Sequence, residues 1–190
     1  MYFLSMTQAN PSQSFQGSIF TLLAAIFRKH EVKPVLIGGY AFIASKVIRS
    51  TFDIDFIVTG EDEAKLEPDI ISTGYTIKKR QGVAVQFKAE KKGLRDLDFL
   101  ITDADTFQKL VKNGRQVIIA GETFIIPSPD HLIAMKLHAI VNNPEREKKD
   151  LLDVIQLIES NSIDPKSSEI KKLFKKYGLE HLFKQITMDK

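Results

Sequence analysis

The sequence predicts an α+β fold in which a mixed β-sheet flanked by helices is followed by a C-terminal helical region. Up to about residue 127, short apolar or alternating runs that are typical of strands are interleaved with helical periodicity. From residue 128 onward the recognisable patterns are all helical. The 190 residues are 43% hydrophobic, which is enough to build a core. We therefore expect an α/β core over residues 1–127 and a helical region over residues 128–190 packed on it.

The first half of the core begins with a polar segment, residues 1–13, that we interpret as a loose lead-in. Apolar residues at helical spacing then predict a helix from Phe15 to His30, with cations in its last turn, where they suit the helix dipole. A short buried strand, Val35–Ile37, ends at a glycine pair, and a helix follows over Tyr40–Val47. Alternating polarity predicts a strand over Phe52–Val58.

The second half of the core contains two hairpins. An acidic helix is expected over 61–67, a hairpin of strands over 75–79 and 83–88, and a further strand over 94–101. A helix over 104–113 and a second hairpin of strands over 117–120 and 123–126 complete it.

Cap and proline signals divide the helical region. Ser128-Pro129 and Asp164-Pro165 each place a capping side chain before a proline, so we expect helices running to about residue 141 and from 166 to 177. Between them, Asn142-Asn143-Pro144 breaks the first helix and another follows over 145–159. Gly178 ends the third, and a last short helix is expected over 179–186.

Composition excludes several classes of protein. The chain has no cysteine, which rules out disulfide scaffolds, thiol catalysis and zinc ribbons. A net charge of +3 is too small to diagnose nucleic-acid binding. No apolar run approaches the ~20 residues of a membrane span, and the start lacks the basic and apolar regions of a signal peptide. We expect a cytoplasmic protein.

Acidic residues in apolar strands are the most informative feature. Asp53 and Asp55 lie two apart, so both project from one face, where they repel unless a cation lies between them. A hard divalent cation suits oxygen ligands, although a solvated sheet face is the alternative. A third acid on a neighbouring strand would make a metal site the better explanation, and Asp98 and Asp96 compete for that position.

The glycine pair Gly38-Gly39 precedes these acids. Glycines at the end of a strand allow a phosphate to approach the backbone closely, although a tight strand-to-helix turn also favours glycine. Thirteen residues lie between Gly39 and Asp53. This glycine pair, the run Arg49-Ser50-Thr51, the Asp-Ile-Asp motif and the later acidic strand together resemble the signature of the DNA polymerase β-like nucleotidyltransferase superfamily.

A second block, residues 127–160, resembles the region after the catalytic sheet in AbiEii/AbiGii-type toxin-like nucleotidyltransferases. The matching positions are Lys136, Ala139, Arg146, Lys149, Asp150 and Asp153. Lys136 falls inside the apolar arc of its helix, so it must reach solvent or meet an anion. Asp150 borders the apolar side of its helix with Arg146 at i−4, and an ordinary ion pair between the two is the alternative interpretation.

The resemblance implies a nucleotidyltransferase-like mixed sheet and a Mg²⁺-dependent transfer of a nucleoside monophosphate from a triphosphate such as ATP to a hydroxyl acceptor. It implies metal ligands at Asp53, Asp55 and Asp98, with two metal ions. The triphosphate would contact Gly38, Gly39, Arg49, Ser50 and Lys136. Asp150 would act as a base or by positioning a substrate.

The acceptor stays open at this point. A toxin-like protein suggests RNA, such as a tRNA end, together with an antitoxin partner. An aminoglycoside-type enzyme suggests a small hydroxylated molecule, and a catalytically silent nucleotide-binding or antitoxin-like module is a third alternative. The lysine pairs 171–172 and 175–176 form a basic stripe. We interpret this stripe as the solvated side of an amphipathic helix, with contact to RNA as the alternative.

Overall fold

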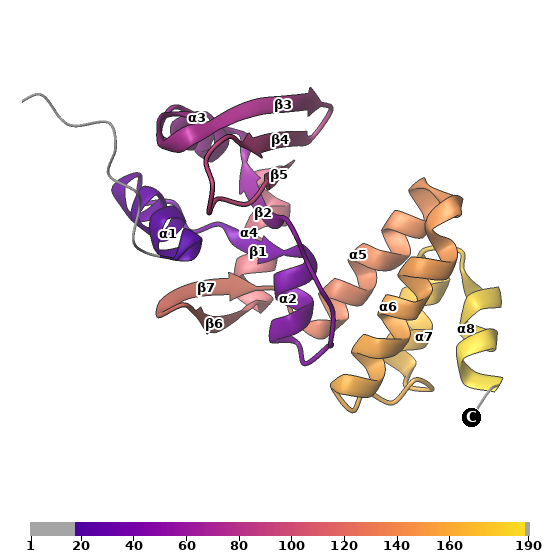
Figure 1. Cartoon of the computed structure of the whole chain (residues 1–190). Coiled ribbons are helices and arrows are strands. Elements are labelled where there is room, and N and C mark those ends of the chain that lie inside the picture. Colours follow the sequence, from indigo (N-terminus) through magenta and orange to yellow (C-terminus); the bar gives the residue numbers. More distant parts are fainter. Residues whose placement is uncertain (1–17, 189–190) are drawn as a thin grey trace, which may run out of the picture.

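The computed structural model describes residues 18–188. The expected lead-in over residues 1–13 and the first three residues of the helix expected from Phe15 lie outside this range. Within it, the chain forms one mixed β-sheet with helices on both faces and a group of helices at one side (Figure 1). The α+β fold expected from the sequence is confirmed.

The sheet has seven strands in the order β3-β4-β5-β2-β1-β7-β6. Their bounds are β1 (Val35–Ile37), β2 (Ile54–Thr59), β3 (Tyr75–Gln81), β4 (Ala84–Ala89), β5 (Leu97–Thr102), β6 (Arg115–Ile119) and β7 (Glu122–Ile126). Two neighbouring pairs, β2 with β5 and β1 with β7, are parallel, and the other pairs are antiparallel. The sheet is therefore mixed, and sequence-distant strands β2 and β5 lie side by side at its centre.

Alternation along the central strand decides which helices cover each face. Phe56 of β2 packs in the large apolar cluster that includes α1 (Ile19–Lys29) and α3 (Gly60–Gly74). The next residue, Ile57, packs on the opposite face with Phe107 and Leu110 of α4 (Ala104–Asn113). Successive strand side chains point to opposite faces, so both faces of β2 are apolar and both need a helical cover.

The helical region joins the same core. It consists of α5 (Pro129–Asn142), the short 3₁₀ turn η1 (Pro144–Arg146), α6 (Glu147–Ser160), α7 (Ser168–Lys176) and α8 (Glu180–Met188). Ser128 caps α5 by accepting a hydrogen bond from the backbone N–H of His131. Buried residues of the sheet and of α5–α8 belong to one continuous cluster, in which Phe42 of α2 (Gly38–Ala44) is 2% exposed and Val154 of α6 is fully buried. Figure 1 shows α2 between the sheet and these helices.

Several expected boundaries shift. The helix expected from Tyr40 begins at Gly38, directly at the end of β1. The short acidic helix continues through Pro68 to Gly74, because Leu66 and Ile70 on either side of the proline are both fully buried. The strand expected from residue 94 begins at Leu97.

The start of α7 also differs from the expectation. The pattern Asp164-Pro165 predicts a helix start, but Asp164 instead closes a turn by accepting from the backbone N–H groups of Lys166 and Ser167. Ser167 is the capping residue, and its hydroxyl accepts from the N–H of Ile170. A cap-plus-proline pattern thus favours a turn as well as a helix start.

No helix within residues 18–188 combines the length and apolar character needed to cross a bilayer.

Candidate active site

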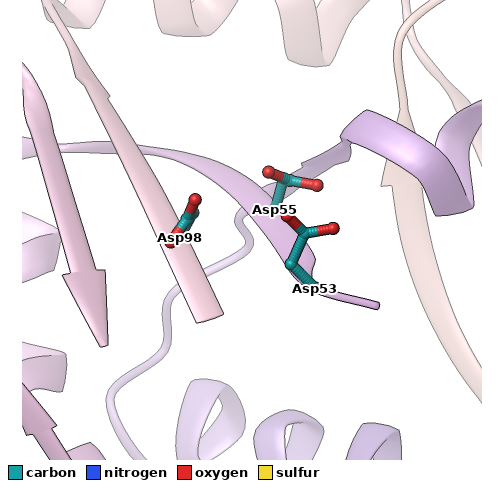
Figure 2. Close-up of side chains that lie close together, drawn as sticks. All are labelled: Asp53, Asp55 and Asp98. Carbon is teal, nitrogen blue, oxygen red and sulfur yellow. The ribbon is translucent and has the colours of Figure 1, made fainter. Parts of the chain in front are cut away.

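Three carboxylates from two strands converge on one point of the sheet. Asp55 of β2 lies directly opposite Asp98 of β5 in the parallel register, so their side chains project from the same face. Asp53 lies just before β2. One oxygen from each of the three residues lies within 4.8 Å of the others. Figure 2 shows the three side chains gathered where the two strands meet.

The structure also separates the two candidates for the third acid. Asp98 belongs to the cluster, whereas the carboxylate of Asp96 accepts a hydrogen bond of 3.0 Å from the backbone N–H of Ala89. Asp96 therefore fastens the chain between β4 and β5, and Asp98 is the residue that faces Asp55.

A glycine corner lies against this cluster. Gly38 has φ +59°, and a Cβ at this position would lie 1.8 Å from Oδ2 of Asp55. A Cβ at Gly39 would lie 2.2 Å from Oγ1 of Thr51. The same hydroxyl of Thr51 donates to Oδ1 of Asp53 at 3.1 Å. A side chain at either position would clash, and the bare backbone lies beside Asp55 at Gly38 and beside Thr51 at Gly39.

The electrostatics of the cluster favour a bound cation. Burial, together with the neighbouring charges of Asp53 and Asp98, raises the pKa of Asp55 to about 7, against the opposing effect of Arg49 and Lys136. Burial also raises the pKa of Asp98. The negative charge of Asp53 adds to this rise, and a hydrogen bond from Gln86 opposes it. Within residues 18–188 none of the three carboxylates forms an ion pair with Lys, Arg or His.

This donor set fits a divalent metal. Three carboxylates offer the oxygen ligands that Mg²⁺ prefers, and a metal would supply the positive charge that the surrounding protein does not pair with them directly. Within residues 18–188, Asp53, Asp55 and Asp98 form a cluster that could hold a hard cation.

A second polar cluster approaches Asp55 from the helical region. Nζ of Lys136, on α5, lies 2.8 Å from Oδ1 of Asp150 and 2.6 Å from Oδ2 of Asp153, both on α6. Nη1 of Arg49, from the loop between α2 and β2, lies 3.4 Å from Oδ2 of Asp153. Asp153 therefore joins the two cations whose charges reach Asp55.

The aromatic ring of Phe42 fixes the same two cations. The guanidinium carbon of Arg49 and Nζ of Lys136 each lie 5.1 Å from the centre of this ring. Both distances fall within the range of cation–π attraction. Lys136 and Arg49 are therefore held beside the acidic cluster by one aromatic ring and a shared carboxylate.

Asp150 is the most enclosed acid of the group. Its side chain is fully buried and is bound on both oxygens, by Nε of Arg146 at 2.8 Å and by Lys136. Burial by itself would raise the pKa of Asp150, but the hydrogen bonds from Arg146 and Lys136 lower it. The intrahelical ion pair between Arg146 and Asp150, considered above as an alternative, is therefore present. The anions that Lys136 contacts are the carboxylates of Asp150 and Asp153.

Some residues around the site carry weak sequence signals. Ser50 lies exposed in the loop that also carries Arg49. Gln86 of β4 donates to Oδ2 of Asp98 at 3.0 Å, yet only the pairing of β4 with β5 brings the two together. Thr51 and Asp153 both stand in the motifs that carried the family resemblance, but spacing alone did not show that they contact Asp53 and Lys136.

Comparison of sequences identifies no relative: no family model matches the chain, and no curated protein matches it.

Solved structures, in contrast, share its fold. The structure of ANT(2")-Ia in complex with adenylyl-2"-tobramycin has a TM-score of 0.65 at 16% identity, covering 86% of this chain and 96% of that one. The lincosamide antibiotic adenylyltransferase LnuA, lincomycin-bound, has a TM-score of 0.52 at 16% identity, with coverages of 78% and 100%.

A third similar structure belongs to a much longer chain. The Megavirus polyadenylate synthase has a TM-score of 0.55 at 13% identity, and the match covers 76% of this chain and 31% of that one. At these identities the likeness concerns the fold. The nucleotidyltransferase-like sheet expected from the sequence is confirmed.

Proposed function

We propose that this protein is a Mg²⁺-dependent nucleotidyltransferase that transfers a nucleoside monophosphate from a nucleoside triphosphate to a hydroxyl group of an acceptor. The observation that carries the proposal is the convergence of Asp53, Asp55 and Asp98 beside the Gly38-Gly39 corner. The shared fold supports it, because similar structures include two named as an adenylyltransferase and a polyadenylate synthase.

Asp53, Asp55 and Asp98 would hold the metal. When bound, Mg²⁺ neutralises charge on the phosphate and on the entering and leaving oxygens. The missing side chains of Gly38 and Gly39 make room for Asp55 and Thr51, so the bare backbone of this corner lies directly beside the place where the triphosphate would bind.

Cations beside the cluster would bind the same triphosphate. Arg49 and Lys136 lie close enough to Asp55 to oppose the rise of its pKa, so their charge extends over the place where the phosphates would lie. The exposed hydroxyl of Ser50 is a further donor in this loop. In a site partly closed to water, such fixed positive groups stabilise the charge of the transition state.

Asp98 would receive the acceptor's proton. The acceptor oxygen forms a bond to the α-phosphorus, the bond from that phosphorus to the bridging oxygen breaks, and pyrophosphate leaves with that electron pair. In the metal-free protein, burial raises the pKa of Asp98, and this preference for the protonated form supports its role as the proton acceptor.

Asp150 would act by position. Because both of its oxygens are engaged and the side chain is buried, we assign it the task of orienting Lys136, and we assign Asp153 the same task toward Lys136 and Arg49. Of the two roles that the sequence left open for Asp150, base and positioning residue, these contacts favour the second.

The test supplies each labelled nucleoside triphosphate, with Mg²⁺, to total RNA and to a panel of hydroxylated small molecules. We expect label to enter one acceptor class, to require Mg²⁺ and to fall to background in Asp53→Asn and Asp55→Asn. Asp105→Asn, at an exposed position in the first turn of α4, is the matched control. Full incorporation by Asp53→Asn would overturn the proposal, and nucleotide binding without any incorporation would favour a silent nucleotide-binding module.

A cytoplasmic location and an antitoxin partner stay predictions of the sequence.

A further inference from the structure

A cavity of about 710 Å³ opens beside the acidic cluster, on the side away from the glycine corner. Asp53 and Asp98 belong to its wall, and the rest comes mainly from β4 and from the segment that joins β4 to β5. The cavity is thus continuous with two of the three carboxylates but includes neither Gly38 nor Gly39.

The strand order places this cavity opposite the proposed triphosphate site. Gly38 follows β1, Asp55 lies on the neighbouring β2, Asp98 on the next strand β5, and the cavity extends over β5 and β4. A nucleotide at the glycine corner and a second molecule in the cavity would therefore meet across the acids. This is the arrangement that transfer between two substrates requires.

The wall of the cavity is rich in cations. Lys78, Lys91, Lys92 and Arg95 line it, against the acids Asp53, Asp96 and Asp98. Two of these acids are among the proposed metal ligands, and Asp96 is engaged with the backbone of Ala89. Once a divalent cation is bound, the surface that faces a ligand is positive.

Two of the cations are held by local structure. A Cβ at Gly74 would lie 2.6 Å from Cδ of Lys91, so the missing side chain makes room for the stem of this lysine. Nη1 of Arg95 donates to the backbone oxygen of Thr51 at 2.9 Å, which fastens the loop that carries the cations to the segment before Asp53. Lys78 lies close enough to Asp98 to oppose the effect of burial on the pKa of that carboxyl.

An exposed aromatic ring completes the cavity. Phe52 is 83% exposed and directly precedes Asp53. A phenylalanine so placed gains nothing from burial in the core, but a nucleobase can stack on its open face, which is worth about 1–3 kcal/mol per base in single-strand binding sites.

Resting on the proposed function, we infer that this cavity is the acceptor site and that its acceptor is the 3′ end of a single-stranded RNA. Lys91 and Lys92 contact phosphates, a base stacks on Phe52, and the terminal hydroxyl points to Asp98. The same charges disfavour a polycationic acceptor such as an aminoglycoside, because like charges would have to be brought together in a partly desolvated site.

The test measures binding of a fluorescent single-stranded RNA oligonucleotide with a free 3′ hydroxyl, at several salt concentrations. We expect Lys91→Gln/Lys92→Gln to weaken binding about tenfold or more and to lower the slope of log affinity against log salt by about 2, one for each phosphate that a lysine no longer neutralises. Phe52→Ala should weaken binding with an unchanged slope. All three side chains are exposed, so these variants should fold normally.

The matched control is Lys171→Gln/Lys172→Gln, which removes the same charge from the exposed side of α7. This variant should bind the oligonucleotide like the original protein. If it loses affinity while the Lys91/Lys92 variant does not, the RNA binds the helical region and the inference is wrong.

Two further measurements separate this inference from the proposed function. Mg²⁺-dependent ATP binding should be unchanged in the Lys91/Lys92 variant, and a loss there would make the cavity the donor site instead. Labelled transfer to a small phosphorylated or polycationic molecule but not to RNA would overturn the acceptor assignment while leaving nucleotidyl transfer intact. RNA binding that follows the expected pattern without any nucleotide binding would overturn nucleotidyl transfer itself.

Discussion

Gly38 determines how closely the backbone approaches the acidic cluster. Two properties of this residue restrict it to glycine: its φ of +59°, and the space that Oδ2 of Asp55 occupies where a Cβ would be. The first is a conformational preference, and the second is a clash with a proposed metal ligand. A second glycine of the chain separates the two effects, because Gly82 has φ +56° with nothing within 4 Å of its Cβ position.

We therefore expect Gly38→Ala and Gly82→Ala to differ. Both substitutions carry the strain of a left-handed alanine, about 1 kcal/mol. Gly38→Ala must in addition displace the carboxylate of Asp55, so it should abolish Mg²⁺ binding, measured by calorimetry, while Gly82→Ala leaves that binding unchanged. Equal metal affinities in the two variants would contradict the close approach seen at the glycine corner.

Asp55 makes the metal-free protein sensitive to pH. Its carboxyl keeps a proton up to a pKa of about 7 in the folded chain, whereas its ordinary pKa is 3.8. Between these values the unfolded chain binds fewer protons at this group than the folded chain, so the contribution of Asp55 to stability falls as the pH rises through this window.

Asp55→Asn removes this dependence. In EDTA, the Tm of the variant minus the Tm of the original protein should therefore increase from pH 5 to pH 8, measured by thermal denaturation. Asp105→Asn, at an exposed position, should show a difference that varies little with pH. A difference for Asp55→Asn that stays constant or decreases would show that this carboxyl ionises normally.

At the scale of elements, α5 and α6 are joined by a buried polar contact. The fully buried carboxylate of Asp150 receives Lys136 from α5 and Arg146 from its own helix. Both helices contribute otherwise apolar faces to the core, including Leu137 and Val154. The contact therefore fixes which turn of α5 lies beside which turn of α6, and so where Lys136 lies relative to Asp55.

Asp150→Asn should be strongly destabilising, because it leaves Lys136 and Arg146 without their shared charge partner. Loss of one member of a buried ion pair costs about 3–5 kcal/mol, and the partial exposure of the two cations and the remaining contact of Lys136 with Asp153 place the expectation at or below the lower value. Chemical denaturation measures it. Asp130→Asn, an exposed acid in the first turn of α5, should cost less than about 1 kcal/mol. Similar losses in the two variants would show that the α5–α6 contact contributes little.

At the scale of the whole molecule, the sheet and the helical region are joined by a shared apolar core, so we expect them to unfold together. The larger of the two apolar clusters contains buried residues of the sheet and of every helix from α5 to α8, so the helical region shares its core with the sheet. The acidic cluster lies on the sheet, while Lys136 reaches toward it from the helices. A ligand bound there as proposed would contact both parts.

One thermal transition is therefore expected, and Mg²⁺ with ATP should move all of it to higher temperature. A ligand at 100 times its Kd adds about 2.7 kcal/mol to the stability of the state that binds it. The shift should disappear in Asp53→Asn, measured by calorimetry. Two separate transitions, with only one of them shifted by the ligand, would contradict a shared core.

Much of this architecture could be predicted from local pattern. The helix over 104–113 has the expected bounds, and Ser128-Pro129 begins α5 as capping chemistry requires. Local patterns were less decisive where the same residues are compatible with either a turn or a helix. Asp164-Pro165 makes a turn before the true cap at Ser167, and Pro68 lies inside α3 because burial on either side outweighs the lost backbone hydrogen bond.

Part of the candidate site could also be predicted from local sequence pattern. Asp53 and Asp55 share a face because strand side chains alternate, and this requires no knowledge of the fold. The third acid could not be chosen by sequence, since Asp96 and Asp98 have the same parity. The parallel register of β2 with β5 decides it by placing Asp98 opposite Asp55.

The sequence by itself determined the fold class, most of the elements and the acidic motif, because these depend on periodicity, capping and the spacing of residues along one chain. Tertiary structure alone decided which acid completes the cluster, which carboxylates hold Lys136, and that lysines of β3 and of the segment between β4 and β5 line one cavity. Each of these depends on distances between segments far apart in the chain, and such distances are fixed only when the strands pair and the helices pack.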